Sequence, residues 1–235
     1  MNLRRLHRFT CQGATALPIA VLLLLSGCAT HLGTGTAEPP NLTAAKEAVI
    51  SYVDSGAYER DLQSAAGAAR TWVRERAARR DPGERLAVVF DVDETVISNL
   101  PHMREMDFGY AVDSWNAWVG AGQAPALPAV RAVFQECRRL GVAVFFVTGR
   151  EEPRDRAGTE KNLREQGMGD YERLILADPA EESQSTAARK ARARSTLERN
   201  EGYRIIASIG DQWSDLEGGF AERVFKLPNP FYRIP

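Results

Sequence analysis

Acidic residues follow an apolar run in the stretch VVFDVDETVISN, at residues 88–99. Asp91, Asp93 and Glu94 stand together there, and Thr95 comes next. Buried carboxylates repel one another and are costly to desolvate unless a cation lies between them. Mg²⁺ prefers oxygen ligands and takes about six of them. The stretch therefore predicts a cation site where a buried strand ends.

Polar residues also follow two other apolar runs. The sequence TGR comes after the run at 142–147, and Asp211 follows the run at 204–209, with Asp215 one helical turn later. In open parallel sheets, ligands bind beyond the carboxyl ends of the strands, so these side chains are expected to converge. One Asp or Thr alone would be an ordinary helix cap. Capping has no need, however, for three aspartates at converging strand ends.

Apolar runs alternate with helical patterns, which predicts an α/β fold with a parallel sheet flanked by helices. The expected strands are 86–90, 142–147, 173–176, 204–209 and a short 223–227. The expected helices are 128–140, 158–166 and 185–199, and an N-terminal helical segment over 43–79 that breaks near Ser55 and Gly56. The segment 100–126 departs from this rhythm and is rich in aromatic residues. It is interpreted as a small cap over the site.

The motifs resemble those of the haloacid dehalogenase (HAD) superfamily, in the family's order and spacing. They are DVDET at 91–95, VTGR at 147–150, Lys190 on a helix and GDQWSD at 210–215. More narrowly, DETVISNLP, WNAWV, FFVTGR, TEKNL, IASIGDQWSDL and the tail LPNPFY resemble the class C acid phosphatases, which are bacterial outer-membrane lipoproteins. The resemblance implies a Rossmann-like HAD core over residues 43–235, with the cap inserted after the first strand. Gly149 departs from the pattern, because many relatives are expected to carry Asn there.

The resemblance implies a Mg²⁺-dependent acid phosphatase that hydrolyses phosphate monoesters, such as 5′-nucleoside monophosphates. Asp91 would attack phosphorus and form an aspartyl-phosphate. Asp93 would protonate the leaving alkoxide and then deprotonate water, as a general acid–base. Thr148 and Lys190 would stabilise charge on the phosphoryl oxygens.

The metal ligands expected by the same resemblance are the carboxylates of Asp91 and Asp211 and the backbone carbonyl of Asp93. Asp215 would hold either Lys190 or a metal-bound water in place.

Aromatic residues are the candidates for recognising the leaving group. Trp115 and Trp118 lie three residues apart, a spacing that suits either stacking on a nucleobase or plain helix packing, and both alternatives stay open. Tyr232 in the tail could stack in the same way. For His102, a surface or cap-packing role is preferred over the alternative of contact with the substrate. Glu94 is interpreted as solvated at the start of the cap, without a direct role.

Composition argues against rival phosphatase chemistries. Of three histidines in the chain, only His102 lies in the expected domain, which is too few for a phosphohistidine enzyme or a dinuclear metal site. A cysteine phosphatase needs Arg six positions after Cys, but Ala143 stands there after Cys137. Cys137 is therefore interpreted as a core residue. Arg150 and Arg156 are expected to pair with nearby acids.

The N-terminus indicates export. A basic start, the apolar run ALPIAVLLLL and the sequence LSGC resemble a signal peptide over 1–27 that ends in the lipobox of bacterial lipoproteins. Cys28 would then carry the lipid, residues 28–42 would form a flexible tether, and Ala29 would favour the outer membrane, facing the periplasm or the cell surface. The alternative is an ordinary signal peptide with an incidental cysteine. The net charge of −1 gives no indication of binding to nucleic acid polymers.

Two alternatives to hydrolysis stay open. A HAD-type phosphotransferase would transfer phosphate to an alcohol faster than to water. A non-catalytic envelope lipoprotein on the same fold would need none of the motif side chains, and their intact set argues against it. An oligomer is possible, but the sequence does not determine it.

Overall fold

Five parallel strands form the centre of the unit that begins at Pro40, in the order β3-β2-β1-β4-β5. The strands are β1 Arg85–Phe90, β2 Ala143–Glu151, β3 Arg173–Ala177, β4 Tyr203–Gly210 and β5 Val224–Lys226. This computed structural model describes residues 39–181 and 183–234, so the predicted signal peptide and Cys28 lie outside it. Within the described residues, the predicted α/β fold with a parallel sheet is confirmed.

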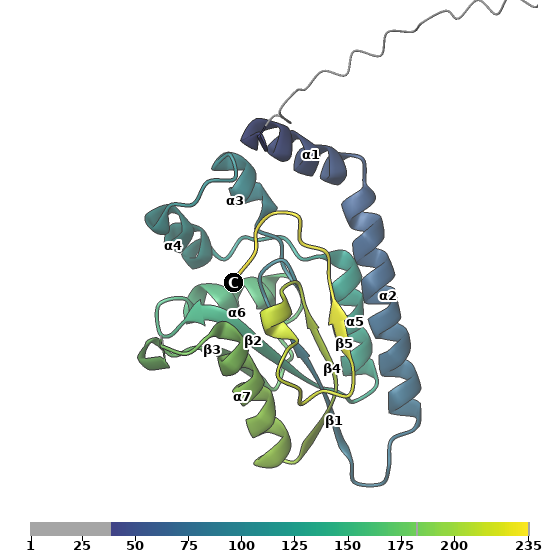
Figure 1. Ribbon diagram of the computed structural model, residues 1–235. Helices are drawn as coiled ribbons and strands as arrows, with labels where there is room; N and C mark the ends of the chain where they lie inside the picture. The colour runs from purple at the N-terminus through teal and green to yellow at the C-terminus, as the bar shows by residue number, and fades with distance from the viewer. Residues whose placement is uncertain (1–38, 182, 235) are drawn as a thin grey trace, which may run out of the picture. The chain divides into compact units, whose positions relative to one another are not determined.

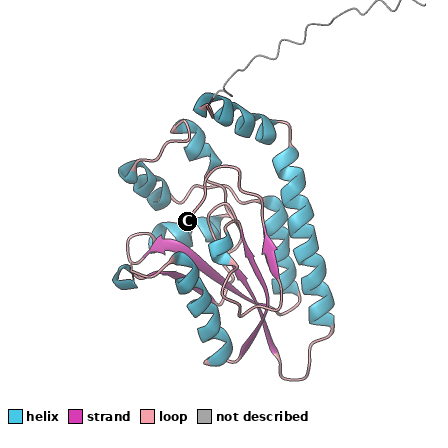
Figure 2. Ribbon diagram, in the orientation of Figure 1, coloured by secondary structure: helices cyan, strands magenta, loops and turns pink. Residues whose placement is uncertain are grey.

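Helices cover both faces of the sheet (Figures 1 and 2). They are α1 Leu42–Asp54, α2 Ala57–Ala78, α3 Leu100–Glu105, α4 Val112–Ala121, α5 Pro128–Arg139, α6 Arg156–Glu165 and α7 Thr186–Arg199, with two short 3-10 turns, η1 Pro179–Glu181 and η2 Trp213–Asp215. The helices α2 and α5 pack on one face, and α7 packs on the other. No helix in the described part of the chain is long and apolar enough to cross a membrane.

The central strands are apolar along their buried middle parts because both of their faces are covered. In β1, Leu86, Val88 and Phe90 point into the core beneath α2 and α5. Ala87 and Val89 point into the smaller core beneath α7. Successive side chains of a strand point to opposite faces, so a strand between two layers of helices needs apolar residues at every position.

The second strand is longer than predicted. The sequence predicts its end at 147, but β2 continues to Glu151. After a register shift, Glu151 pairs with Ala177, and the backbone N–H of Glu152 donates to the carbonyl of Ala177 at 2.9 Å. Because this pairing with β3 resumes, Thr148 and Arg150 lie in the strand itself and not in a loop after it.

The segment 100–126 contains α3 and α4, and its two ends meet at the base of the insertion. The N–H of Ser98 donates to the carbonyl of Pro125 at 2.8 Å, and the N–H of Leu127 donates to that of Val96 at 3.0 Å. These bonds close the insertion where it leaves and rejoins the core. The two ends of the insertion are therefore fixed next to each other at the edge of the core.

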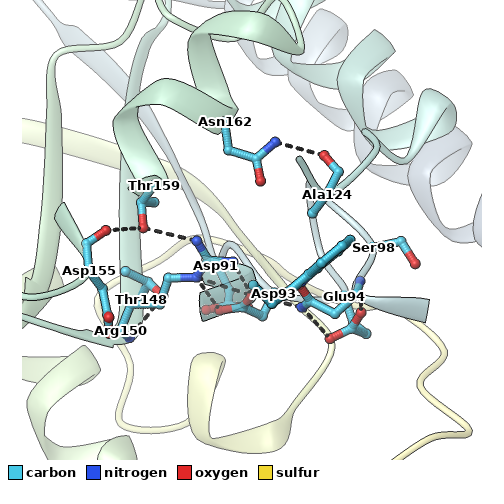
Figure 3. A network of polar contacts seen from close by, with 12 residues as sticks. Asp91, Asp93, Glu94, Ser98, Ala124, Thr148, Arg150, Asp155, Thr159 and Asn162 are labelled. Carbon is cyan, nitrogen blue, oxygen red and sulfur yellow. Dashed lines mark hydrogen bonds and ion pairs between the residues drawn. The ribbon is translucent and has the colours of Figure 1, made fainter. Parts of the chain in front are cut away.

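The inserted helices also dock on α6. Asn162 donates a hydrogen bond from Nδ2 to the carbonyl of Ala124 at 2.7 Å (Figure 3). Gly158 lets the two backbones approach closely, since a Cβ there would lie 2.2 Å from the carbonyl oxygen of Val119. A side chain at residue 158 would force α4 away from α6, so only glycine allows this close packing of the two helices.

Cys137 lies on α5 and is fully buried, as predicted for a core residue. Burial raises the pKa of its thiol to about 12. A thiol that is neither exposed nor ionised near neutral pH packs as a small apolar side chain.

Glu136 connects α5 to α2 through arginines. Its carboxylate accepts from Nε of Arg74 at 2.8 Å, from Nη2 of Arg70 at 3.1 Å and from Nη2 of Arg139 at 2.5 Å. The side chain of Glu136 is only 3% exposed. Hydrogen bonds from Arg74 and Arg139 hold the pKa of this carboxyl well below its ordinary value, because they favour the ionised form.

Glu136→Gln should therefore lower the free energy of unfolding at pH 7 by about 1 kcal/mol, a modest value because the arginines are partly exposed. A carboxyl whose pKa is depressed in the folded state adds stability above its unfolded pKa of about 4.3, and this stability fades as the pH falls below it. The difference between wild type and variant should thus shrink steadily below about pH 4 in urea unfolding curves. Glu75→Gln, at an exposed position of α2, is the matched control. An equal loss at pH 7 and pH 3 would contradict this account.

Candidate active site

The ends of two neighbouring strands bring the first acidic residues together. Phe90 of β1 pairs with Ile209 of β4, and the N–H of Asp91 donates to the carbonyl of Ile209 at 2.9 Å. Asp91 and Asp211 therefore follow adjacent strands at the same end of the sheet. This is the convergence that the sequence predicts.

Asp215 joins these two residues in one buried cluster. Carboxylate oxygens of Asp91, Asp211 and Asp215 lie within 4.8 Å of one another. The approach of Asp215 depends on Gly210, where a Cβ would lie 2.3 Å from the Cβ of Asp215. The sequence predicts that Asp215 holds Lys190 or a metal-bound water and does not itself bind the metal. In the structure, its carboxylate lies among the three that could hold an ion.

Lys190 is the cation of this cluster. Its ammonium lies 2.5 Å from Oδ1 of Asp91 and 2.5 Å from Oδ1 of Asp215, and the side chain is buried. Burial opposes the positive charge, but the two carboxylates raise the pKa of Lys190 above its ordinary value. Of the two partners predicted for Asp215, the structure therefore shows Lys190.

Three buried carboxylates face one ammonium, so negative charge is in excess. Burial raises the pKa of Asp91 well above its ordinary value, with Lys190 opposing this. Burial and the charge of Asp215 raise the pKa of Asp211. A divalent cation would compensate this charge, and a donor set made of oxygen atoms alone fits a hard ion such as Mg²⁺. The residues present therefore fit a metal site.

Asp211 is oriented by three neutral donors. Its oxygens accept from Oγ1 of Thr95 at 3.0 Å, from Nε2 of Gln212 at 2.6 Å and from Nδ2 of Asn229 at 2.6 Å. Asn229 was not predicted as a site residue. The tail sequence LPNPFY, which resembles the family's tail, was the signal that could have identified it.

Asp93 belongs to a second cluster, beside the first. Arg150 donates to its carboxylate from Nη2 at 2.7 Å and from Nε at 3.0 Å, and the Arg150 side chain is almost fully buried. Nη1 of Arg150 donates to Oγ1 of Thr159 at 3.0 Å (Figure 3). The expected pairing of Arg150 with an acid is confirmed, and so is that of Arg156, which lies 2.8 Å from Glu160.

Asn99 connects this cluster to the cap. Its Nδ2 donates to Oδ1 of Asp93 at 2.8 Å and to Oε2 of Glu94 at 3.0 Å, and its Oδ1 accepts from Nε1 of Trp118 at 2.8 Å. Because the indole nitrogen can only donate, the orientation of the amide is determined. Sequence reasoning missed Asn99, since a polar residue after a motif has no spacing that distinguishes it.

The prediction that Glu94 is solvated is wrong. Its side chain has no exposed area, and its carboxylate accepts from the N–H of Asn99 at 2.5 Å and from Oη of Tyr232 at 2.7 Å. Glu94 adopts a positive φ of 52°, which turns its side chain inward, away from the path of a regular strand. Burial, and then the charge of Asp93, raise its pKa to about 7, against the hydrogen bonds from Tyr232 and Asn99.

A cavity of about 500 Å³ joins both acidic clusters to aromatic side chains. Its aromatic lining comes from α3 and α4, the connection between them, and the C-terminal tail: His102, Phe108, Tyr110, Trp115, Phe231 and Tyr232. Trp115 and Tyr232 therefore line the cavity, which is compatible with the stacking role for which they are candidates. Trp118 is not among the residues that line this cavity, and its ring stacks on buried His102 at 5.4 Å. His102 packs within the cap, as one of its two predicted roles.

Thr148 lies at the side of this site. It is buried, and its Oγ1 accepts from the N–H of Arg150 at 3.2 Å. Together with Lys190, it lines a neighbouring cavity of about 380 Å³, and Gly149 borders both cavities. A Cβ at Gly149 would meet no atom within 4 Å, so the glycine leaves open space at this edge.

Solved structures share this fold. The class C acid phosphatase of Bacillus anthracis superposes with a TM-score of 0.67 and 22% identity, over 81% of this chain and 84% of that protein. The same enzyme with tungstate bound gives a TM-score of 0.66, with 21% identity over 80% of this chain and 86% of that protein.

Relatives in plants are closer in sequence. Acid phosphatase 1 of Solanum lycopersicum is 41% identical over 150 residues, which cover 62% of this chain and 58% of that protein. The Stem 28 kDa glycoprotein of Glycine max is 43% identical over 154 residues, 62% of this chain and 59% of that protein. The chain thus spans less than two thirds of the length of these relatives.

The match to the family as a whole extends further. Residues 27–235 match the family model described as HAD superfamily, subfamily IIIB (acid phosphatase). This match includes both acidic clusters, the cap and the tail. The chain belongs to the acid phosphatases of subfamily IIIB of the HAD superfamily.

Proposed function

We propose that this chain hydrolyses phosphate monoesters with the help of a bound Mg²⁺. The observation that carries the proposal is the division of buried carboxylates into two groups on one cavity. Asp91 lies against Lys190 and the other acids of the first cluster, whereas Asp93 is held apart by Arg150. Lys190 and a bound Mg²⁺ would favour the ionised form of Asp91 that a nucleophile needs, against the effect of burial, and Asp93 is held separately for proton transfer.

In the first step, Asp91 acts as the nucleophile. An oxygen of its carboxylate forms a bond to phosphorus as the bond to the leaving oxygen breaks, which gives an aspartyl-phosphate. Lys190, 2.5 Å from Asp91, lies where it can stabilise negative charge on the phosphoryl oxygens. A bound Mg²⁺ would supply charge neutralisation between the phosphate and the acidic cluster.

Asp93 moves the protons. It gives a proton to the leaving alkoxide in the first step, and it takes one from the water that attacks the aspartyl-phosphate in the second. Water then releases inorganic phosphate and regenerates the Asp91 carboxylate, so atoms and protons balance over one turnover. Arg150 and Asn99 hold the Asp93 carboxylate in one orientation through hydrogen bonds.

For the substrate, we propose nucleoside monophosphates and other small monoesters with a flat leaving group. Trp115 and Tyr232 lie in the same cavity as Asp91 and Asp93. Aromatic rings at a site that also holds a phosphate offer stacking area for a nucleobase or an aryl group.

Family membership alone does not decide that the chain is an enzyme, because relatives include a protein named Vegetative storage protein 1, from Arabidopsis thaliana, 28% identical over 214 residues. Catalysis is favoured here by the arrangement of the site. The groups proposed for both steps line one cavity or lie in hydrogen-bond contact with those that do. A scaffold would have no use for a buried excess of negative charge.

Asp91→Asn should abolish phosphate release, by a factor of about 10³ or more, because an amide is a poor nucleophile. Release would be measured with nucleoside monophosphates, aryl phosphates, sugar phosphates and glycerol phosphate, in Mg²⁺ and in EDTA. Asp81→Asn, at an exposed turn before β1, is the matched control. Wild-type activity of Asp91→Asn would rule out the nucleophile, and transfer to added alcohol outrunning release to water would identify a phosphotransferase instead.

The metal can be tested without turnover. Mg²⁺ at ten times its dissociation constant should stabilise the folded protein by about 1.4 kcal/mol, which raises Tm by roughly 3–5 °C. Asp211→Asn should reduce this shift, since it removes one of the clustered carboxylates. The measurement is thermal unfolding in Mg²⁺ and in EDTA. A wild-type Tm that is the same in both would argue against the metal site.

We also propose that the protein is exported and anchored by a lipid on Cys28, at the outer membrane. The support is the lipobox-like sequence before this residue, which lies outside the described part of the chain.

Cys28→Ser should move the protein from the membrane fraction to the soluble fraction, because the thiol that carries the lipid is lost. Immunoblots of fractionated cells measure this. Cys11→Ser, within the predicted signal peptide, is the control and should remain in the membrane fraction. A Cys28→Ser variant that stays with the membrane would contradict the lipid anchor.

A further inference from the structure

Glu94 is a buried carboxylate that the proposed mechanism does not use. Its side chain has no exposed area, although it stands next to Asp93. Burying a carboxylate beside another one is costly unless strong hydrogen bonds compensate it. We therefore looked for the contacts that compensate the burial of Glu94 and for what they do.

Three neutral donors converge on this carboxylate. Tyr232 donates from Oη at 2.7 Å, and Asn99 donates from its backbone N–H at 2.5 Å and from Nδ2 at 3.0 Å. The first of these contacts spans 138 positions of sequence and ties the C-terminal tail to the segment after β1. Hydrogen bonds to an ionised acceptor are about twice as strong as those between neutral groups.

The tail forms further hydrogen bonds on the side of Asp211, including one from Nε2 of Gln212 to the carbonyl of Tyr232 at 3.4 Å. Asn229 donates to Asp211 at 2.6 Å, and the N–H of Ile234 donates to Oε1 of Gln212 at 3.1 Å. The hydrogen bond to Glu94 is the one that connects Tyr232 to the segment after β1. The Tyr232 residue is 37% exposed, so its ring forms part of the cavity wall while its hydroxyl is anchored.

We propose that Glu94 is a positioning residue that anchors the Tyr232 hydroxyl and so determines where the aromatic wall stands relative to Asp93. The link to Asp93 is Asn99, whose Nδ2 donates to both carboxylates. The Glu94 carboxylate thus holds the Tyr232 wall, and the Asn99 amide connects this carboxylate to Asp93, the proposed acid–base. This inference rests on the proposed function and specifies how the site selects leaving groups.

The consequence is a selective effect on substrates. Without the hydrogen bond to Glu94, the Tyr232 ring is still present but is no longer fixed in position. A substrate with a large flat leaving group must then order the tail when it binds, and this costs binding free energy. A substrate such as glycerol phosphate is too small to depend on this wall.

Tyr232→Phe removes the anchoring hydroxyl and keeps the ring. We expect KM for a nucleoside monophosphate to rise about three- to tenfold, the value of one ordinary hydrogen bond, and KM for glycerol phosphate to rise clearly less. Tyr203→Phe, at the opposite end of β4, is the matched control and should change neither substrate. An equal loss for both substrates, or no change for either, would overturn the proposal.

Glu94→Gln tests the other partner. Its amide presents one acceptor oxygen in place of two, so the contacts with Tyr232 and Asn99 compete for it. If the two residues act through one contact, the double variant Glu94→Gln/Tyr232→Phe should raise KM for the nucleotide no more than the larger of the two single effects. Effects that multiply would overturn the shared anchor.

A measurement without turnover separates this proposal from the proposed function. Hydrogen exchange of the backbone amides at residues 229–234, followed by mass spectrometry on the full chain, reports how firmly the tail is held. Exchange should become faster in Tyr232→Phe and in Glu94→Gln, and it should not change in Tyr203→Phe. Unchanged exchange in both site variants would overturn the anchor even if the enzyme is active. Faster exchange would support it even if no substrate of the panel is hydrolysed.

Discussion

The buried excess of negative charge at the carboxyl end of the sheet is the constraint on which the rest of the structure depends. Asp91, Asp211 and Asp215 lie together, and the ammonium of Lys190 contacts two of them, Asp91 and Asp215. Such a cluster destabilises the fold unless donors and a cation surround it. Gly210 leaves room for Asp215, N–H and side-chain groups donate to these carboxylates, and the cluster could hold a divalent ion.

Two cations divide the acids into separate environments. Lys190 lies with the carboxylates that could hold a metal, whereas Arg150 pairs with Asp93, which lines the same cavity. This division gives residues only two positions apart in sequence different surroundings, which suits the different roles proposed for them. The arginine is a better choice for Asp93 than a lysine, because its planar fork fixes the plane of the carboxylate as well as its place.

The cavity itself is assembled from segments that are distant in sequence. The cap is closed at its base by hydrogen bonds with the core, and it packs on α6 at Gly158 and Asn162. The C-terminal tail forms hydrogen bonds with Asp211 and Glu94, which follow the ends of two strands. The catalytic groups alone would leave an open, hydrated edge. The cap and the tail form its walls, and we propose that these walls select the leaving group.

The sequence by itself determined the parallel sheet and the residues of the catalytic motifs, because strand periodicity and the residues that follow each strand are local properties. Of the predicted site residues, Asp91, Asp93, Lys190 and Asp211 line one cavity in the structure, whereas Thr148 lines the neighbouring one. Only the tertiary structure decided which acid is buried and which aromatic faces the cavity. Trp115 and Trp118 share one helical spacing, so local pattern cannot separate a lining residue from one packed on His102. Glu94, Asn99 and Asn229 acquire their roles from contacts with distant segments, and such contacts leave no period in the sequence.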